Sequence, residues 1–377
     1  MRIVVAPDSF KEALPAAEVG RAIERGLRLA LPDSEIVCIP MADGGEGTVA
    51  VVSAATGGIV RDAWVTGPLG SPVRAHYAVI DAGSTAIIEM ASASGLSLAP
   101  IENRDPGKAS TFGTGELIRH AVEAGARRIV LGIGGSATND GGAGMAQALG
   151  WSLRDSDDRE LERGGLALAG LSRIDGSRRL AALDEVEVLV ACDVNNPLAG
   201  PDGASQIYGP QKGASPEMVG RLDEALAHFG EEIEKHLGIS VSEIPGAGAA
   251  GGLGAGMVAF AGARLRPGVE LVAEAVGLAE ALRGADLVIT GEGKIDAQSI
   301  HGKTPVGVAR MAKAAGVPVV ALAGVLGEGY RHVYEHGIDA AFCIAPGPIG
   351  LDESKRRTAE LLEAVAESVG RFWRWKR

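Results

Sequence analysis

The stretch GIGGSATNDGGAG occupies residues 132–144 and directly follows the apolar run Arg128–Leu131. A predicted strand thus leads into a loop rich in glycine and hydroxyl side chains, and a helix is expected next, over residues 145–149. Such a loop leaves backbone N–H groups without partners, and the positive end of the helix dipole would point at the same place. The stretch therefore predicts an anion-binding loop in an α/β fold.

Acidic residues accompany this loop. It ends in Asp140, and three further loops that combine glycine with Asp or Glu lie elsewhere in the chain. Carboxylates are ligands that divalent cations prefer, and such cations commonly bridge phosphate groups. The residues therefore favour phosphoryl transfer as the class of chemistry.

Composition limits the range of partners. The chain has 377 residues, enough for two domains, and 55 glycines that lie among apolar runs and so indicate loop chemistry. A net charge of -12 and 4% aromatic residues argue against nucleic acid as a partner. No signal peptide or membrane span is predicted, so we expect a cytoplasmic protein without a membrane partner, with homo-oligomerisation possible.

Strand and helix patterns alternate at both ends of the chain. The five predicted strands are Ile3–Ala6, Ile36–Ile39, Leu287–Thr290, Val317–Ala323 and Ala340–Ala345. We therefore expect an α/β protein in which residues 1–59 and 284–377 form a discontinuous, doubly wound, flavodoxin-like domain with a parallel sheet. Residues 60–283 would form an inserted second α/β domain, with hairpins over residues 60–89 and the glycine-rich loop. Two lobes imply a cleft between them.

Further polar loops follow predicted strands or precede helices. They are PDSFK at 7–11, MADGGEGT at 41–48, CDVNNPL at 192–198, GPQKG at 209–213, TGEGKID at 290–296 and GKTP at 302–305. In an open parallel sheet the ligand binds outside the carboxyl ends of the strands. These loops supply carboxylates and lysines, which suit metal-assisted phosphoryl transfer better than acid–base catalysis by histidine.

Two classes of alternative function stay open. The dinucleotide-binding pattern is matched at Gly132–Ala137 and at Gly246–Gly251, but a chain with 55 glycines matches it easily. Neither match lies in the opening strand-turn-helix of the doubly wound sheet, where the pattern belongs. A dinucleotide-dependent oxidoreductase and a non-catalytic, two-lobed sugar-acid binding protein remain as alternatives.

Eight ordered blocks closely resemble the bacterial glycerate kinase family (type 1, glycerate 2-kinase-like). They are residues 7–11, 41–48, 134–142, 196–198, 209–213, 248–254, 291–298 and 302–305, and they span nearly the whole chain. The resemblance implies ATP-dependent phosphorylation of D-glycerate, most often to 2-phosphoglycerate, by a two-domain α/β protein whose first domain is discontinuous. Mg²⁺ would assist the transfer in the interdomain cleft.

Roles for single residues follow as hypotheses. The phosphate or nucleotide would bind Gly134, Gly135, Ser136, Thr138, Asn139 and Gly293. The candidate metal ligands are Asp43, Glu46, Asp140 and Glu292. Asp8, Ser9, Asn195, Asn196 and Lys212 would bind the substrate. Lys11 or Lys303 would neutralise charge on the transferred group, and Asp193 or Asp296 would accept the hydroxyl proton. The sequence leaves open which acid is the base and which lobe binds ATP.

Overall fold

The computed structural model describes residues 1–300 and 302–375, which divide into two compact units. The terminal unit comprises Met1–Asp43, Ala50–Thr56 and Pro267–Arg377, and the middle unit comprises Gly44–Val49 and Gly57–Arg266. These limits differ from the expected ones in three places. Residues 44–49 and 57–59 belong to the middle unit, and residues 267–283 belong to the terminal unit, where helix α9 (Gly268–Ala275) packs against helix α11 (Thr304–Ala314).

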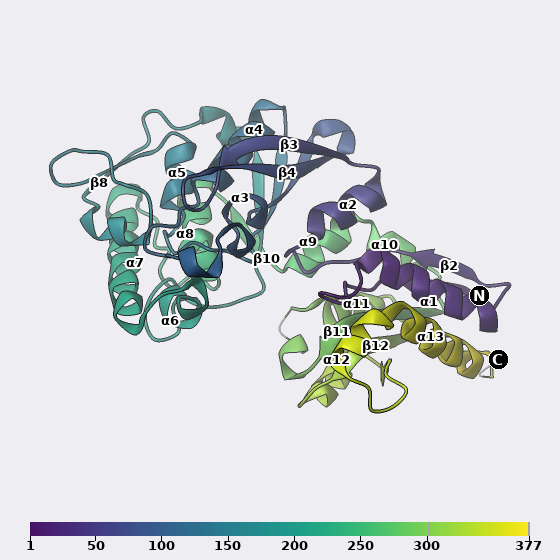
Figure 1. Ribbon diagram of the computed structural model, residues 1–377. Helices are drawn as coiled ribbons and strands as arrows, with labels where there is room; N and C mark the ends of the chain where they lie inside the picture. The colour runs from purple at the N-terminus through teal and green to yellow at the C-terminus, as the bar shows by residue number, and fades with distance from the viewer. Residues whose placement is uncertain (301, 376–377) are drawn as a thin grey trace. The chain divides into compact units, whose positions relative to one another are not determined.

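The terminal unit is built on a five-stranded sheet whose strands all run parallel (Figure 1). Its spatial order is β13-β12-β11-β1-β2, with bounds Arg2–Val5 (β1), Glu35–Cys38 (β2), Leu287–Ile295 (β11), Val319–Leu326 (β12) and Ala340–Cys343 (β13). Counted along the chain, this is the order 2-1-3-4-5 of flavodoxin-like sheets. The predicted doubly wound sheet is therefore confirmed.

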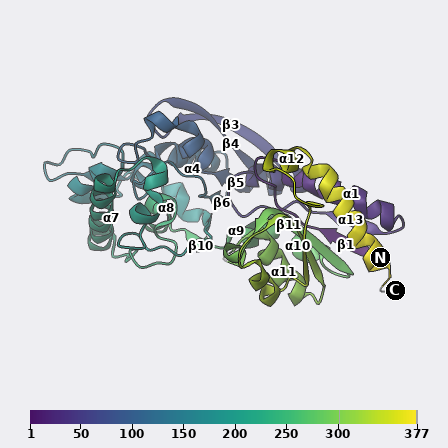
Figure 2. The ribbon, with the colours of Figure 1, turned by 60° about the horizontal axis from the view of Figure 1, so that its bottom comes forward.

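Helices pack on both faces of this sheet. The helices that lie wholly or partly in this unit are α1 (Ala16–Ala30), α2 (Thr48–Thr56), α9, α10 (Leu278–Ala281), α11, α12 (Leu351–Arg356) and α13 (Thr358–Arg374). Helices α1 and α13 lie together on one face and α11 lies on the other (Figure 2). Helix α1 buries Val19, Ile23 and Leu27, which are four residues apart and so share one side of the helix.

Strand β11 is longer than its sequence indicates. The prediction ends this strand at Thr290 and places Glu292 and Lys294 in a loop. The structure extends it to Ile295, because Glu292 pairs with Ala323 and Lys294 with Val325 of β12. Pairing with a neighbouring strand thus overrides the loop signal of two glycines.

The middle unit contains a six-stranded mixed sheet, in the order β10-β9-β6-β5-β4-β3. The bounds are Ile59–Thr66 (β3), Pro72–Ile80 (β4), Thr85–Glu89 (β5), Arg128–Gly132 (β6), Glu187–Ala191 (β9) and Arg264–Arg266 (β10). Strands β5, β6, β9 and β10 run parallel, whereas β3, β4 and β5 pair antiparallel. The antiparallel part covers the residues whose turn signals indicate hairpins.

Helices and one small strand pair complete the middle unit. They are α3 (Ala91–Ser94), α4 (Phe112–Glu123), α5 (Ala143–Ala148), α6 (Ala204–Tyr208), α7 (Pro216–Leu237), α8 (Ala249–Ala261) and the pair β7 (Ser152–Arg154) with β8 (Arg173–Asp175). Helix α8 is almost wholly buried. Among the described residues, no helix is both long and apolar enough to cross a membrane.

The contact between α1 and α13 gives a stability prediction. A methyl group on Gly26 would collide with the backbone of Glu363 and lie 2.9 Å from the amide of Glu367. We therefore expect Gly26→Ala to lower the melting temperature, although alanine favours a helix by about 1 kcal/mol. Gly220→Ala in α7 is the control, because its methyl group would meet nothing within 4 Å. That variant should be as stable as the wild type or up to about 1 kcal/mol more stable. Scanning calorimetry checks both, and an unchanged Gly26→Ala would contradict the packing argument.

Candidate active site

The terminal unit gathers polar side chains where its strand order reverses. The chain turns from β1 toward β2 on one side and toward β11 on the other, and open α/β sheets bind ligands at such a point. Asp8 follows β1, and its amide donates to the carbonyl of Gly291 at 2.9 Å. Because Glu292 follows Gly291 in β11, two predicted site residues come from neighbouring strands of the same sheet edge.

Asp8 and Glu292 are carboxyl groups in poorly hydrated surroundings. Burial raises the pKa of Asp8 to about 6, and the nearby charge of Asp43 adds to this shift. Thr304 and the amide of Ser9 donate hydrogen bonds to Asp8 and act in the opposite direction. Burial likewise raises the pKa of Glu292 to about 7. Asp8 and Asp43 raise it further, against hydrogen bonding by Ser299 and the charge of Lys303.

Lys303 lies beside these acids at the start of α11. Its Nζ is 3.8 Å from Oε1 of Glu292 and 3.7 Å from Oδ1 of Asp296. Asp296 also accepts a hydrogen bond from Lys294, at 2.8 Å between Nζ and Oδ2, and this bond lowers the pKa of its carboxyl group. A carboxylate held by two lysines is a weaker proton acceptor than one without such partners. The surroundings of Asp296 therefore suit a residue that stabilises charge at least as well as they suit the predicted general base.

The remaining predicted residues of this unit lie close by. Gly293 packs beside the first loop, because a methyl group on it would lie 3.7 Å from the amide of Lys11. The side chain of Lys11 itself is exposed. The structure thus brings Asp8, Ser9, Lys11, Asp43, Glu292, Gly293, Asp296 and Lys303 into one unit.

The glycine-rich loop of the middle unit leaves the end of β6. Within the described chain, no acceptor takes the backbone N–H groups of Gly134, Gly135, Ser136, Thr138 and Asn139, whereas that of Ala137 donates to Ser94 at 3.0 Å. Gly134 and Gly135 are exposed, so this part of the loop is accessible to a ligand. Helix α5, which follows, has only six residues, so the loop amides matter more here than the predicted helix dipole.

Asp140 anchors this loop. Its buried carboxylate accepts hydrogen bonds from the amide of Thr111 at 2.8 Å, from the hydroxyl of Thr111 at 3.0 Å and from the amides of Gly142 and Gly144 at 3.2 and 3.3 Å. Burial raises the pKa of this carboxyl group, and the four hydrogen bonds oppose that shift. Both oxygens are engaged, so of the four predicted metal ligands Asp140 is the one that the geometry supports least.

The other candidate metal ligands lie in different units. Asp43 and Glu292 belong to the terminal unit, whereas Glu46 and Asp140 belong to the middle unit. In the part of the chain that the structure describes, no three Asp, Glu, His or Cys side chains form a group suited to a metal ion. A metal held here would therefore use few protein ligands, as Mg²⁺ commonly does when phosphates and water complete its coordination.

Lys212 is more buried than a substrate-binding lysine in a loop should be. Its side chain is 2% exposed, and Nζ donates to the carbonyl oxygen of Thr138 at 2.6 Å. Burial lowers the pKa of this ammonium group to about 7, although the charge of Asp140 acts in the opposite direction. The residue was predicted from its motif to bind the substrate, but the structure places its amine against the backbone of the anion loop.

Asp193, Asn195 and Asn196 follow β9, the parallel neighbour of β6, and so leave the same sheet edge as the loop. Asn196 is engaged within the fold: it donates to Asp202 at 2.8 Å and accepts a hydrogen bond from Tyr208 at 2.7 Å. Asn195 is exposed and Asp193 is half-buried. Of the two asparagines, Asn195 is thus the one whose side chain is accessible to a substrate.

Sequence reasoning missed Glu89. This buried glutamate ends β5, which pairs with β6, and its Oε1 accepts a hydrogen bond from the amide of Val49 at 2.7 Å. It thereby holds the end of the segment that carries Glu46. The available signal was a single acid that closes the apolar strand TAIIE at residues 85–89.

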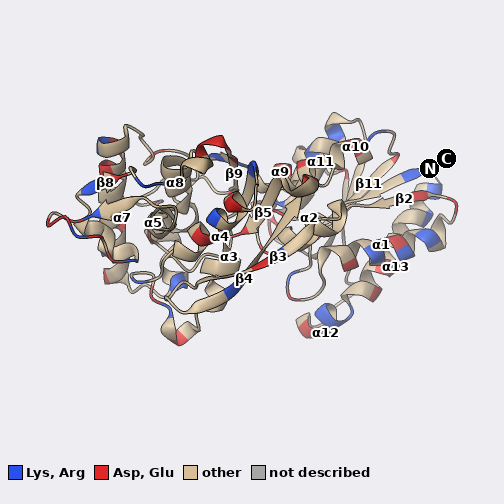
Figure 3. Cartoon of the chain, turned by 90° about the horizontal axis from the view of Figure 1, so that it is seen from above, with Lys and Arg blue, Asp and Glu red and all other residues tan. Residues whose placement is uncertain are grey.

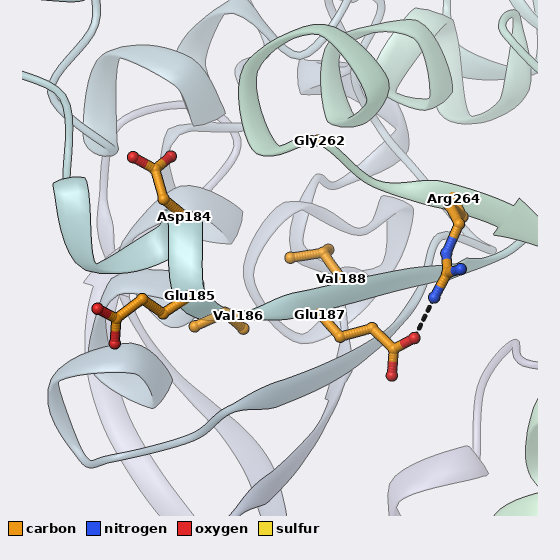
Figure 4. Close-up of a pocket in the computed structure, with 7 residues that line it drawn as sticks. All are labelled: Asp184, Glu185, Val186, Glu187, Val188, Gly262 and Arg264. Carbon is orange, nitrogen blue, oxygen red and sulfur yellow. Dashed lines mark hydrogen bonds and ion pairs between the residues drawn. The ribbon is translucent and has the colours of Figure 1, made fainter.

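A surface hollow elsewhere in the middle unit is not part of this site. It is lined by Asp184, Glu185, Val186, Glu187, Val188, Gly262 and Arg264 (Figure 4). Glu187 begins β9, so the hollow lies at the opposite sheet edge from the anion loop. Acidic and basic residues are interspersed along this unit (Figure 3), and Arg264 is paired with Glu187. Three of the residues that line the hollow are acidic and one is basic, so the hollow does not favour an anionic ligand.

The raised pKa values of Asp8 and Glu292 predict how stability depends on pH. Both groups bind protons more tightly in the folded than in the unfolded state, so the free energy of unfolding should fall as pH rises from about 4 to about 7. Glu292→Gln removes one of them. We expect the metal-free wild type to lose on the order of 2 kcal/mol more than this variant over that range.

Urea unfolding at several pH values measures this difference. Glu335→Gln, at an exposed glutamate of the same unit, is the control and should follow the wild type. If Glu292→Gln kept the pH dependence of the wild type, the pKa of Glu292 would not be raised in the folded state.

Comparison with known proteins identifies the family. The sequence model of the glycerate kinase family matches residues 3–374. Glycerate 2-kinase of Escherichia coli K12 is 53% identical over 94% of this chain and 93% of its own length, and glycerate kinase of Halalkalibacterium halodurans is 52% identical over 100% and 99%. A solved structure of a candidate glycerate kinase 2 from Salmonella typhimurium LT2 is 48% identical, with a TM-score of 0.90 over 100% of this chain and 99% of that one. The resemblance inferred from the eight motifs is thereby confirmed: the chain belongs to the glycerate kinase family.

Proposed function

We propose that this protein transfers the terminal phosphoryl group of ATP to D-glycerate and forms 2-phosphoglycerate with the help of Mg²⁺. The observation that carries the proposal is the loop after β6, where five backbone N–H groups have no acceptor in the described chain. An array of free amides at a strand end is suited to phosphate oxygens. The E. coli relative supports the choice of the 2-hydroxyl, because its name is glycerate 2-kinase.

The proposal assigns the nucleotide phosphates to Gly134, Gly135, Ser136, Thr138 and Asn139. Their amides supply fixed dipoles, which stabilise phosphate charge without reorganising during the reaction. The net charge of -12 makes such local groups necessary, since the overall field repels an anionic ligand. At Gly293 the backbone would approach a phosphate group closely, because glycine has no side chain.

Mg²⁺ would be held by Asp43 and Glu292, with Glu46 as a further candidate. The fit rests on the acids themselves: Asp43 disfavours the charge of Asp8 and of Glu292, and a divalent cation would relieve that repulsion. Bound Mg²⁺ would neutralise charge on the transferred phosphoryl group.

The acceptor chemistry is assigned to lysines and carboxylates. Lys303, and Lys11 as the alternative, would stabilise charge on the transferred group. Asp296 or Asp193 would accept the proton of the glycerate hydroxyl, and Asp8, Ser9 and Asn195 would position the substrate. Lys212 and Asn196 are engaged within the fold, so their contribution to substrate binding would be indirect.

The activity itself is the first test. We expect ADP release that requires ATP, Mg²⁺ and D-glycerate together, and a phosphorus NMR spectrum that identifies 2-phosphoglycerate. Omission of glycerate is the control. A dinucleotide-dependent oxidoreductase would instead be stabilised by NADH, and a non-catalytic sugar-acid binding protein would bind glycerate without consuming ATP. Either result would refute the proposal, and 3-phosphoglycerate as product would refute its regiochemical part.

The role of Lys303 is the second test. Lys303→Met removes the cation beside Glu292 and Asp296, and we expect turnover to fall by roughly 100-fold or more. Lys313→Met is the matched control on the same helix, because Lys313 is exposed and pairs with Asp339 at 2.7 Å. That variant should keep the turnover of the wild type. Steady-state kinetics with both substrates saturating measure the difference, and equal turnover of the two variants would exclude Lys303 from the reaction.

A further inference from the structure

One peptide unit of the anion loop, between Thr138 and Asn139, is contacted by two residues that are distant in the sequence. The buried amine of Lys212 donates to the Thr138 carbonyl at 2.6 Å. Within the described residues Lys212 forms no ion pair with any carboxylate, so this carbonyl is its hydrogen-bond partner, and the charge of Asp140, which lies beyond ion-pair distance, adds a weaker compensation for its burial. A neutral acceptor repays only part of the cost of removing an ammonium group from water. Lys212 therefore occupies a position that stability alone does not favour.

Gly251 packs against the same peptide. A methyl group on Gly251 would collide with the Thr138 carbonyl and lie 2.7 Å from Cα of Asn139. The carbonyl of Gly251 also accepts a hydrogen bond from Gly141 at 3.0 Å. Close contact without a side chain thus fixes the position of the loop, while the lysine fixes the direction of the peptide.

The turn that carries Gly251 is strained at Ala250. Ala250, Gly251 and Gly252 all have positive φ, with values of 54°, 72° and 89°. Alanine rarely adopts this left-handed conformation, and strain of this kind persists where surrounding structure enforces it, often at functional sites. A buried charge and a strained turn therefore converge on a single peptide.

Thr138 and Asn139, the two residues joined by this peptide, each carry an unsatisfied polar atom. Oγ1 of Thr138 and Oδ1 of Asn139 are buried and have no hydrogen-bond partner within the described chain. Buried polar atoms in folded proteins normally have a partner, supplied by protein, water or ligand. Their presence indicates that this region of the loop is completed by something other than the polypeptide.

We propose that Lys212 is a positioning residue for phosphoryl transfer: it holds the Thr138 carbonyl so that the Asn139 amide stays directed at the phosphate. In a trans peptide the C=O and N–H groups point in opposite directions, so a lysine that captures the carbonyl orients the amide away from itself. The inference rests on the proposed function. In this role Lys212 does not contact the substrate directly but controls the loop that binds the nucleotide phosphates.

Lys212→Met tests this role, because methionine fills much of the same volume without an amine. We expect kcat/KM for ATP to fall at least 100-fold and ADP to bind at least tenfold more weakly in calorimetry, while the melting temperature shifts by only a few degrees. The amides of residues 134–140 should also exchange hydrogen faster. Lys235→Met is the matched control in the same unit, because Lys235 is exposed and pairs with Glu232 at 2.8 Å. It should leave all four readouts unchanged.

Chemical rescue separates positioning from packing. In Lys212→Ala, added n-propylamine can restore an amine beside the Thr138 carbonyl, and we expect it to recover part of the lost activity. The same amine should not affect Lys235→Met.

Two results would overturn the proposal. One is unchanged kinetics and ADP binding in Lys212→Met, and the other is a large loss of melting temperature with no rescue, which would make the lysine a purely structural support. ADP binding is measured apart from turnover, so the outcome for the loop does not depend on the acceptor. If wild type did not phosphorylate D-glycerate but Lys212→Met still weakened ADP binding, the proposed function would fail while the assignment of Lys212 would stand.

Discussion

The middle unit depends on backbone segments that approach one another more closely than side chains allow. The end of β6 illustrates this constraint, since a methyl group on Gly132 would collide with the carbonyl of Gly44. Gly251 imposes the same condition on the Thr138–Asn139 peptide. These close contacts hold the loop, in which five N–H groups have no acceptor within the described chain and Gly134 and Gly135 are exposed. The high glycine content is therefore a requirement of the anion loop and its supports, in addition to the needs of ordinary turns.

Charge is distributed between the two units in a complementary manner. The terminal unit concentrates carboxylates with Lys303 at the reversal point of its sheet, and burial together with mutual repulsion raises the pKa values of Asp8 and Glu292. The middle unit instead offers neutral dipoles, with Asp140 satisfied by four hydrogen bonds inside the loop. One unit thus suits cations and acid–base chemistry, and the other suits anions. This division follows from local structure alone, since each set is built within its own unit.

Much of this architecture could be predicted from the sequence, because hydrophobic periodicity and turn residues are local signals. The five strands of the terminal unit lie where the apolar runs place them. The features that the sequence did not predict depend on contacts between residues that lie far apart in the chain. The extension of β11 to Ile295 needs β12 as a partner, and the burial of Lys212 needs the Thr138 carbonyl. Glu89 went unnoticed because its hydrogen-bond partner, Val49, lies forty residues away in the sequence.

The division of the chain also limits how this protein can be cut into separate fragments. Residues 44–49 belong to the middle unit, but they are flanked on both sides by residues of the terminal unit. The motif at 41–48 is therefore shared, with Asp43 on one side of the division and Gly44 to Thr48 on the other. A fragment cut at residues 57 and 266 would lack the strip of backbone that contacts Gly132 and Gly134 and that Glu89 holds through Val49. Neither unit can therefore be exchanged for that of another protein without breaking the motif at 41–48, because this motif contributes residues to both units.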